Sequence, residues 1–235
     1  DDHIILASPA SITNPLLLAN PIDGGTDGSG GGDSLTVLSA GTTWTVITAT
    51  SGTISNASTT PPRGFTDIEN VINTGSGTLD YSTVLGAVTV NLDRTRGFTT
   101  IIGNNNGVTV PLGNDSTLLG SNNPTTWTIY GTNSGEVTWP TLTTPITFSA
   151  FNNLTGNLNT DTFVFAAHPT LPNTTGLITG LIQGGAGPGL NTVCGLNGDN
   201  DWSITAANTV NLNPGITDTA TNYTTFQEIQ LLRGG

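Results

Sequence analysis

Apolar residues recur along this chain in short alternating runs. Residues 43–48 alternate, with Trp44 and Val46 on one face, and residues 88–92 alternate more cleanly. The same pattern returns at residues 108–110, 126–129 and 163–165. Such short runs, rich in Val, Ile, Thr and Trp and bounded by Gly, Asn and Pro, are typical of β-strands. No window of a dozen residues has a helical period free of Gly and Pro, so the pattern predicts an all-β fold.

The apolar pattern also repeats over a long period. Three times a tryptophan opens an alternating segment, and at a similar distance further along a phenylalanine opens a short apolar run. These pairs are Trp44 with Phe65, Trp127 with Phe148, and Trp202 with Phe226. The first two copies align without a gap throughout this segment, and the third is contracted. A long internal period is typical of repeat architectures.

The repeat sets the expected domain organisation. Residues 33–235 form a β-repeat domain, with repeats at about 33–114, 115–190 and 191–235. So long a period fits several coils of an elongated parallel β-solenoid, either a β-helix or a β-roll. One small β-sandwich per repeat is the alternative.

Residues 1–32 differ from the repeats and form an apolar arm on a Gly-rich linker. The arm carries two apolar clusters, which are Ile4, Ile5 and Leu6, and then Leu16, Leu17 and Leu18. We predict that these clusters act in assembly. Two alternatives stay open: the arm covers the end of its own core, or it adds a strand to a neighbouring subunit.

Charge narrows the choice of partners. Sixteen acidic residues face four arginines, there is no lysine, and the net charge is −12. Four arginines cannot neutralise a nucleic acid or an anionic membrane surface, so neither is expected as a partner.

No apolar segment is long enough to span a membrane. The chain begins without Met or a basic segment, which fits a mature or excised fragment. Its one cysteine, Cys194, is predicted to be a small buried apolar residue.

Several segments resemble the repeats of very large bacterial surface proteins, the filamentous-haemagglutinin-like and RTX-adjacent adhesins. The segments that carry this resemblance are residues 65–72, residues 78–82 with 88–92, and residues 151–156 leading into 161–165. The resemblance covers roughly residues 24–235. It implies a right-handed parallel β-helix or β-roll and a location at the cell surface.

The resemblance also raises calcium binding. Tandem G-G-x-G-x-D turns in RTX repeats cage calcium with Asp carboxylates and turn carbonyls. Here residues 28–35 fit that turn imperfectly, residues 156–163 keep only the Asp, and residues 184–193 replace it with Asn191. Asp23, Asp27 and Asp33 are the best remaining place for a calcium ion. The simpler interpretation is solvated acids on a glycine loop.

Catalytic candidates are few. Asp80 and the group Asp93, Arg94 and Arg96 are the only local clusters with the residue types of a polysaccharide-cleaving site. His3 and His168 are not paired with cysteine or with a zinc-binding motif. We therefore do not expect an enzyme, although a polysaccharide-active β-helix enzyme stays the third alternative.

The preferred hypothesis is an extracellular structural protein that assembles head to tail with copies of itself. It would be a subunit or stalk segment of a surface fibre, sheath or adhesin, because stacked strands expose edges at both ends. The second hypothesis is an adhesin module that binds glycan or another surface. Its candidate binding residues are Trp139, Tyr130, Arg94 and Arg96.

Overall fold

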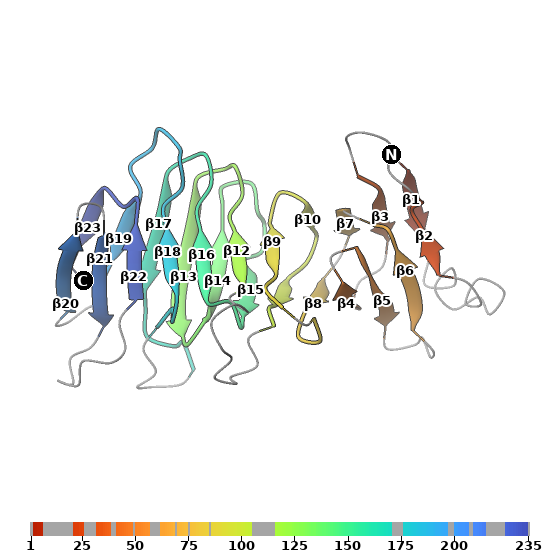
Figure 1. Ribbon diagram of the computed structural model, residues 1–235, viewed down its shortest axis with the longest axis horizontal. Coiled ribbons are helices and arrows are strands. Elements are labelled where there is room, and N and C mark those ends of the chain that lie inside the picture. The colour runs from red at the N-terminus through yellow and green to blue at the C-terminus, as the bar shows by residue number, and fades with distance from the viewer. Residues whose placement is uncertain are drawn as a thin grey trace. The chain divides into compact units, whose positions relative to one another are not determined.

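The computed structural model of the chain is all-β, which confirms the predicted class. It describes residues 2–6, 21–25, 32–38, 41–48, 50–56, 62–68, 70–74, 76–84, 86–104, 116–170, 176–196, 200–206, 209–214 and 224–234. Within these ranges there is no helix, and most neighbouring strands are parallel (Figure 1). Residues 108–110, predicted as a strand, lie outside the described residues.

The chain divides into two compact units. Unit 1 comprises residues 1–88 and 94–104, and unit 2 comprises residues 89–93 and 105–235. Each unit contains strands of two sheets.

In unit 1, one sheet is wholly parallel. Its order is β1 (His3–Leu6), β3 (Ser34–Val37), β7 (Asn70–Asn73) and β10 (Thr95–Arg96). The other sheet has the order β2 (Ile22–Asp23), β6 (Arg63–Thr66), β5 (Ser51–Asn56), β4 (Thr42–Thr48), β8 (Gly77–Asp80) and β11 (Thr100–Ile102). Strands β4, β5 and β6 form an antiparallel meander, and the remaining neighbours are parallel.

Unit 2 repeats this mixture. One set of strands has the order β15 (Ile146–Ser149), β14 (Ser134–Thr138), β13 (Thr125–Gly131), β17 (Asp161–Phe165), β19 (Thr192–Cys194) and β23 (Leu231–Arg233). The other has the order β20 (Asn200–Ala206), β21 (Thr209–Pro214), β22 (Thr224–Gln227), β18 (Leu181–Gln183), β16 (Asn153–Thr155), β12 (Thr117–Leu119) and β9 (Thr89–Asn91). Meanders β13–β15 and β20–β22 are antiparallel, and the other neighbours are parallel.

The sequence repeat corresponds to these three meanders. In each, the tryptophan lies on the first strand and the phenylalanine on the third. Trp44 meets Phe65 edge-on at 5.7 Å between ring centroids, and Trp127 meets Phe148 edge-on at 5.9 Å. The third pair, Trp202 and Phe226, is tilted at 6.4 Å. One difference was not expected from the sequence: within unit 2, the second and third meanders lie in different sheets.

The residue two positions after each repeat phenylalanine turns the chain at the end of the meander. Asp67, Ala150 and Glu228 each lie two residues after the repeat phenylalanine, and each has a left-handed backbone, with φ between 53° and 61°. The residue that follows then bonds back to the meander in two of the copies, Ile68 to the carbonyl of Thr50 and Phe151 to that of Asn133. The repeat therefore preserves a left-handed turn, although a different residue type occupies it in each copy.

The core of unit 2 is built from rows of stacked apolar side chains. Along one sheet, parallel register aligns one residue from each of five strands, and each is at most 1% exposed: Val90, Leu118, Leu154, Ile182 and Phe226. Phe226 meets Phe165 of β17 edge-on at 5.8 Å, which joins the two sheets across the core. Stacking of like residues in register buries a continuous apolar interior.

Cys194 corrects one prediction. In β19 the inward position belongs to Val193, which is fully buried, whereas Cys194 is a free thiol on the partly exposed face. Successive residues of a strand point to opposite faces, so the two cannot both be core residues.

Candidate functional site

The N-terminal arm begins as part of this chain's own sheet. Residues 3–6 form β1, which pairs in parallel with β3, and Leu6 is buried opposite Val37. For these residues the structure matches the first alternative, in which the arm covers its own core. Ile4 is partly buried, whereas Ile5 is 60% exposed on the outer face. Leu16, Leu17 and Leu18 lie outside the described residues.

Six strands end the sheets of the described residues and leave one edge open: β1, β2, β9, β10, β20 and β23. Four of them belong to the first and last parts of the described chain. In unit 1 these are β1 and β2, each of which has a single neighbour later in the chain. In unit 2 they are β20 and β23, each of which has a single neighbour in its sheet. An open edge carries backbone N–H and C=O groups that can pair with another strand. These edges are the candidate functional site.

Backbone hydrogen bonds show which residues of β1 face β3 and which face the open edge. Ser34 N–H donates to the carbonyl of Asp2, and Leu38 N–H donates to that of Leu6, so even-numbered residues of β1 face β3. Alternate residues of a strand direct their backbone groups to opposite sides. His3 and Ile5 therefore present their backbone groups at the open edge.

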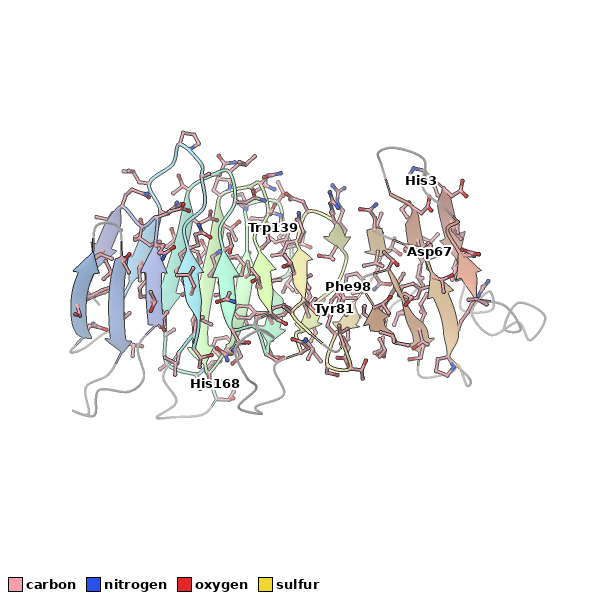
Figure 2. The ribbon with its side chains drawn as sticks, in the orientation of Figure 1. His3, Asp67, Tyr81, Phe98, Trp139 and His168 are labelled. Atoms are coloured by element: carbon pink, nitrogen blue, oxygen red, sulfur yellow. The ribbon has the colours of Figure 1, made fainter. Side chains whose placement is uncertain are left out.

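The proposed binding residues in unit 2 lie apart. Trp139 follows β14, where Thr138 is opposite Thr126, whereas Tyr130 lies at the far end of β13. Tyr130 meets His168 edge-on at 4.9 Å, and Figure 2 shows Trp139 and His168 at opposite ends of the strands. Burial, with a smaller effect from the Glu136 carboxylate, raises the pKa of the Tyr130 phenol. Trp139 is partly exposed beside a turn closed by Leu142 N–H to the Trp139 carbonyl at 2.9 Å.

Arg94 and Arg96 lie in unit 1 and are both exposed. Arg94 is in the turn that precedes β10, and Arg96 is in β10, opposite Ile72 of β7. The segment is therefore not one extended strand.

The calcium candidates are only partly described. Asp23 is exposed, and its carboxylate accepts the N–H of Gly25 at 3.0 Å. Asp33 is buried and accepts the N–H of Asp2, and Asp27 lies outside the described residues. Among the residues that the structure places, no three His, Cys, Asp or Glu side chains come together as a metal site. Calcium binding stays a prediction.

The acids considered for catalysis each stabilise a turn. Asp80 accepts the N–H of Ser82 at 2.8 Å in unit 1. Asp93, in unit 2, accepts the hydroxyl of Ser121 at 2.8 Å and the N–H of Asn122 at 3.0 Å. Hydrogen bonds of this kind satisfy turn backbone groups and give the carboxylates a structural role.

Asp161 is a buried acid that sequence reasoning had noted only as a remnant of a calcium-type turn. Its Oδ2 accepts the N–H of Asn157 at 3.1 Å, and its own N–H donates to the Asn191 side chain at 2.9 Å. Its Oδ1 is buried without a hydrogen-bond partner among the described residues. Burial raises the pKa of Asp161 to about 6, against hydrogen bonds from Asn157 and Thr125 that act in the opposite direction.

Asn191 occupies the corresponding place one strand further along. Thr162 and Phe163 lie opposite Thr192 and Val193, so Asp161 and Asn191 both immediately precede matched strand positions. Asn191 N–H donates to Oε1 of Gln230 at 2.7 Å. In the sequence, Asp161 follows Gly156 and Asn191 follows Gly184, and this similarity was the available signal for the two hydrogen-bonded turns.

Compared with family models, curated proteins and solved structures, the chain matches none significantly. In the described part of the chain there is no helix long and apolar enough to cross a membrane. The functional argument therefore rests on the residues and edges described above.

Proposed function

We propose that this chain is a self-assembling structural subunit or stalk segment of an extracellular fibre, sheath or adhesin, built as a β-solenoid. The observation that carries the proposal is the set of open strand edges, β1 and β2 in unit 1 and β20 and β23 in unit 2. Edges of this kind are templates for pairing with another copy.

A solenoid is supported by the way the parallel strands follow one another along the chain. Thr117 lies opposite both Thr89 and Asn153, and Leu154 lies opposite Ile182, so each strand pairs with the one that a single coil would bring beside it. Parallel neighbours one coil apart, with apolar residues stacked in register, are what a solenoid requires. The first and last coils of such a stack would each present open edges.

Composition supports a structural role at the cell exterior. The chain has no lysine and only 9% charged residues, so its polar surface consists mainly of Thr, Asn, Ser and Gly. Arginine and lysine are the only sites of tryptic cleavage, which leaves few places for such a protease to act on an exposed fibre.

Negative-stain electron microscopy of the purified chain, with and without calcium, tests the proposal. We expect regular filaments that lengthen with protein concentration, because a head-to-tail contact does not close on itself. Dispersed particles at all concentrations and in both conditions would overturn self-assembly. Filaments only with calcium would direct attention to Asp23, Asp27 and Asp33.

A surface-binding module is the second candidate, and the partial exposure of Trp139 favours it. Partly exposed aromatic rings beside turns offer a flat apolar face to sugar rings and to protein surfaces. Glycan-array binding that Trp139→Ala abolishes, with the free energy of unfolding unchanged, would support this candidate over the structural one.

A further inference from the structure

The third repeat tryptophan is less covered than the first two. Trp44 and Trp127 are fully buried, whereas Trp202 is partly exposed. All three have an apolar residue opposite them on the second strand of the meander, Ile54, Val137 and Leu212. The difference therefore lies on the other side of the tryptophan strand.

In the first two repeats, a later strand of the chain covers that side. Strand β8 pairs in parallel with β4 and places Leu79 opposite Trp44. Strand β17 pairs in parallel with β13 and places Phe163 opposite Trp127. Among the described residues β20 pairs only with β21, so the corresponding side of Trp202 has no strand against it. The repeat thus specifies what the missing neighbour is: a parallel strand with an inward apolar residue opposite Trp202.

The hydrogen-bond pattern of β13 also indicates which residues of the neighbouring strand would face β20. Thr125 N–H donates to the carbonyl of Thr160, and Ala166 N–H donates to that of Ile129, so odd-numbered residues of β13 face β17. Trp127 is one of these residues, and Trp202 occupies its place in β20. The backbone of Trp202 therefore faces the open edge, and its partner must be a residue whose own backbone faces away.

Strand β1 meets both requirements. Ile4 is an inward residue, aligned with buried Leu35, and its backbone faces β3. His3 and Ile5, on either side, present their backbone groups at the open edge. We propose that β1 of a second copy pairs in parallel with β20, with Ile4 opposite Trp202. This inference rests on the self-assembly proposed above and names its joint.

This register uses every residue of β1. It places Ile5 opposite Ser203, Leu6 opposite Ile204 and His3 opposite Asp201. Ile5 and Ser203 are both exposed on the outer face of their strands. Pairing gives the exposed Ile5 side chain a neighbour and gives Trp202 the cover that the other two repeat tryptophans have.

Strands β2 and β23, the other two open edges, can pair in the same way, with a residue that faces the edge opposite one that faces away from it. In β23, Leu231 and Arg233 bond to β19 through Asn191 and Gly195, so Leu232 faces the open edge. In β2, Gly24 N–H donates to the Thr66 carbonyl, so Ile22 faces β6 and Asp23 faces outward. Ile22 therefore fits opposite Leu232, which sets Asp23 opposite Arg233. Both are exposed and they carry opposite charges.

Cysteine cross-linking of the full chain tests the joint. One variant carries Ile5→Cys and the other carries Ser203→Cys, each with Cys194→Ser to remove the native thiol. Parallel neighbours lie about 4.8 Å apart, within the Cα separation of disulfides. We expect a disulfide-linked dimer when the two variants are mixed and oxidised. Thr126→Cys is the matched control, because Thr126 is exposed on β13, which has neighbours on both sides.

The outcomes separate the joint from the proposed function. Cross-linking of Ile5→Cys with Ser203→Cys, at least tenfold above the Thr126→Cys control, supports the joint. Self-cross-linking of Ser203→Cys alone would show a symmetric contact between two β20 edges and overturn it. Filaments in electron microscopy without the mixed cross-link would keep self-assembly and reject this joint, whereas absence of both filaments and cross-link would reject both.

Discussion

Gly135 of β14 lies directly opposite Phe148 of β15, and a Cβ atom on Gly135 would lie only 3.0 Å from the Phe148 ring. Gly52 stands in the same relation to Phe65 in the first repeat. In the third repeat Val210 takes this place opposite Phe226, and there the tryptophan and phenylalanine rings are tilted at 6.4 Å. The glycine is what lets the phenylalanine ring lie close to the tryptophan edge.

Replacing that glycine should therefore destabilise the fold. In Gly135→Ala the new Cβ would lie 2.2 Å from the Thr128 carbonyl oxygen, so backbone must move. We expect a loss of about 1–3 kcal/mol in the free energy of unfolding, which is typical of overpacking. The denaturant midpoint, with unfolding monitored by tryptophan fluorescence, measures this loss.

Gly64→Ala is the control for this experiment. Gly64 lies in β6, and the nearest atom to a new Cβ is 3.5 Å away, an ordinary contact. This variant should unfold close to the wild-type midpoint. Equal midpoints for the wild type, Gly135→Ala and Gly64→Ala would show that the close approach carries no energy.

Asp161 should make the fold more stable in mild acid than at neutral pH. Its folded-state pKa, about 6, lies above the ordinary 3.8, so the folded state holds the proton more tightly than the unfolded state. Its contribution to stability is fully present below about pH 4 and is lost as the pH rises through about 6. A shift of this size corresponds to roughly 3 kcal/mol. Free energies of unfolding measured between about pH 4 and 8 check this.

The matched variant is Asp161→Asn, since Asn191 already occupies the corresponding place in the next strand. The neutral amide should remove this part of the pH dependence and raise stability at neutral pH. Other carboxylates contribute equally to both proteins, so the difference between the two curves isolates Asp161. Parallel curves for the two proteins would contradict a neutral carboxyl in the folded state.

Ala150→Gly should stabilise the protein. Ala150 has φ 61°, and this left-handed conformation costs a non-glycine residue about 1–2 kcal/mol. Glycine relieves that strain but adds entropy to the unfolded chain, about 0.4–1 kcal/mol. The net expectation is a gain of about 0.5–1 kcal/mol in thermal or denaturant unfolding. Ala166→Gly, at a position without positive φ, should instead lose stability, and the same sign for both variants would argue against relief of strain.

Much of the fold was predictable from alternation and repetition. Trp44 and Val46 share a buried face because residues two apart in a strand point the same way. The gapless alignment of the first two copies matched tryptophan and phenylalanine positions, and the structure places these on equivalent strands of two meanders. These are local signals, and each needs only a few neighbouring residues to be read.

Strand partners and sheet membership were not predictable in the same way. Nothing near Trp202 indicates that its meander joins β18, because that choice depends on residues far apart in sequence. Ala150 gives no sign of a left-handed backbone, since glycine or asparagine would be the expected residue there. Cys194 was assigned to the wrong face because a run as short as residues 192–194 leaves its register open. The open edges likewise became visible only once the strand order was known.

The proposed second joint predicts a charge-reversal rescue between Asp23 and Arg233. Arg233→Asp in one copy would set two acids opposite each other, and Asp23→Arg would set two arginines opposite each other, so each single variant should assemble more weakly. Exposed pairs contribute up to about 1 kcal/mol, so the expected loss is up to about fivefold in association at each joint. The chain that carries both changes restores opposite charges and should recover wild-type assembly.

Sedimentation velocity at low and high salt measures this prediction, because salt screens exposed charges and should narrow the differences among the four proteins. Arg94→Asp is the control for net charge alone, since Arg94 is also exposed but lies in the turn before β10, which is not one of the strands of the proposed joints. If Arg94→Asp weakens assembly as much as Arg233→Asp does, overall charge is responsible. If the double variant assembles no better than either single one, Asp23 and Arg233 are not neighbours at the joint, and the pairing of β2 with β23 is wrong.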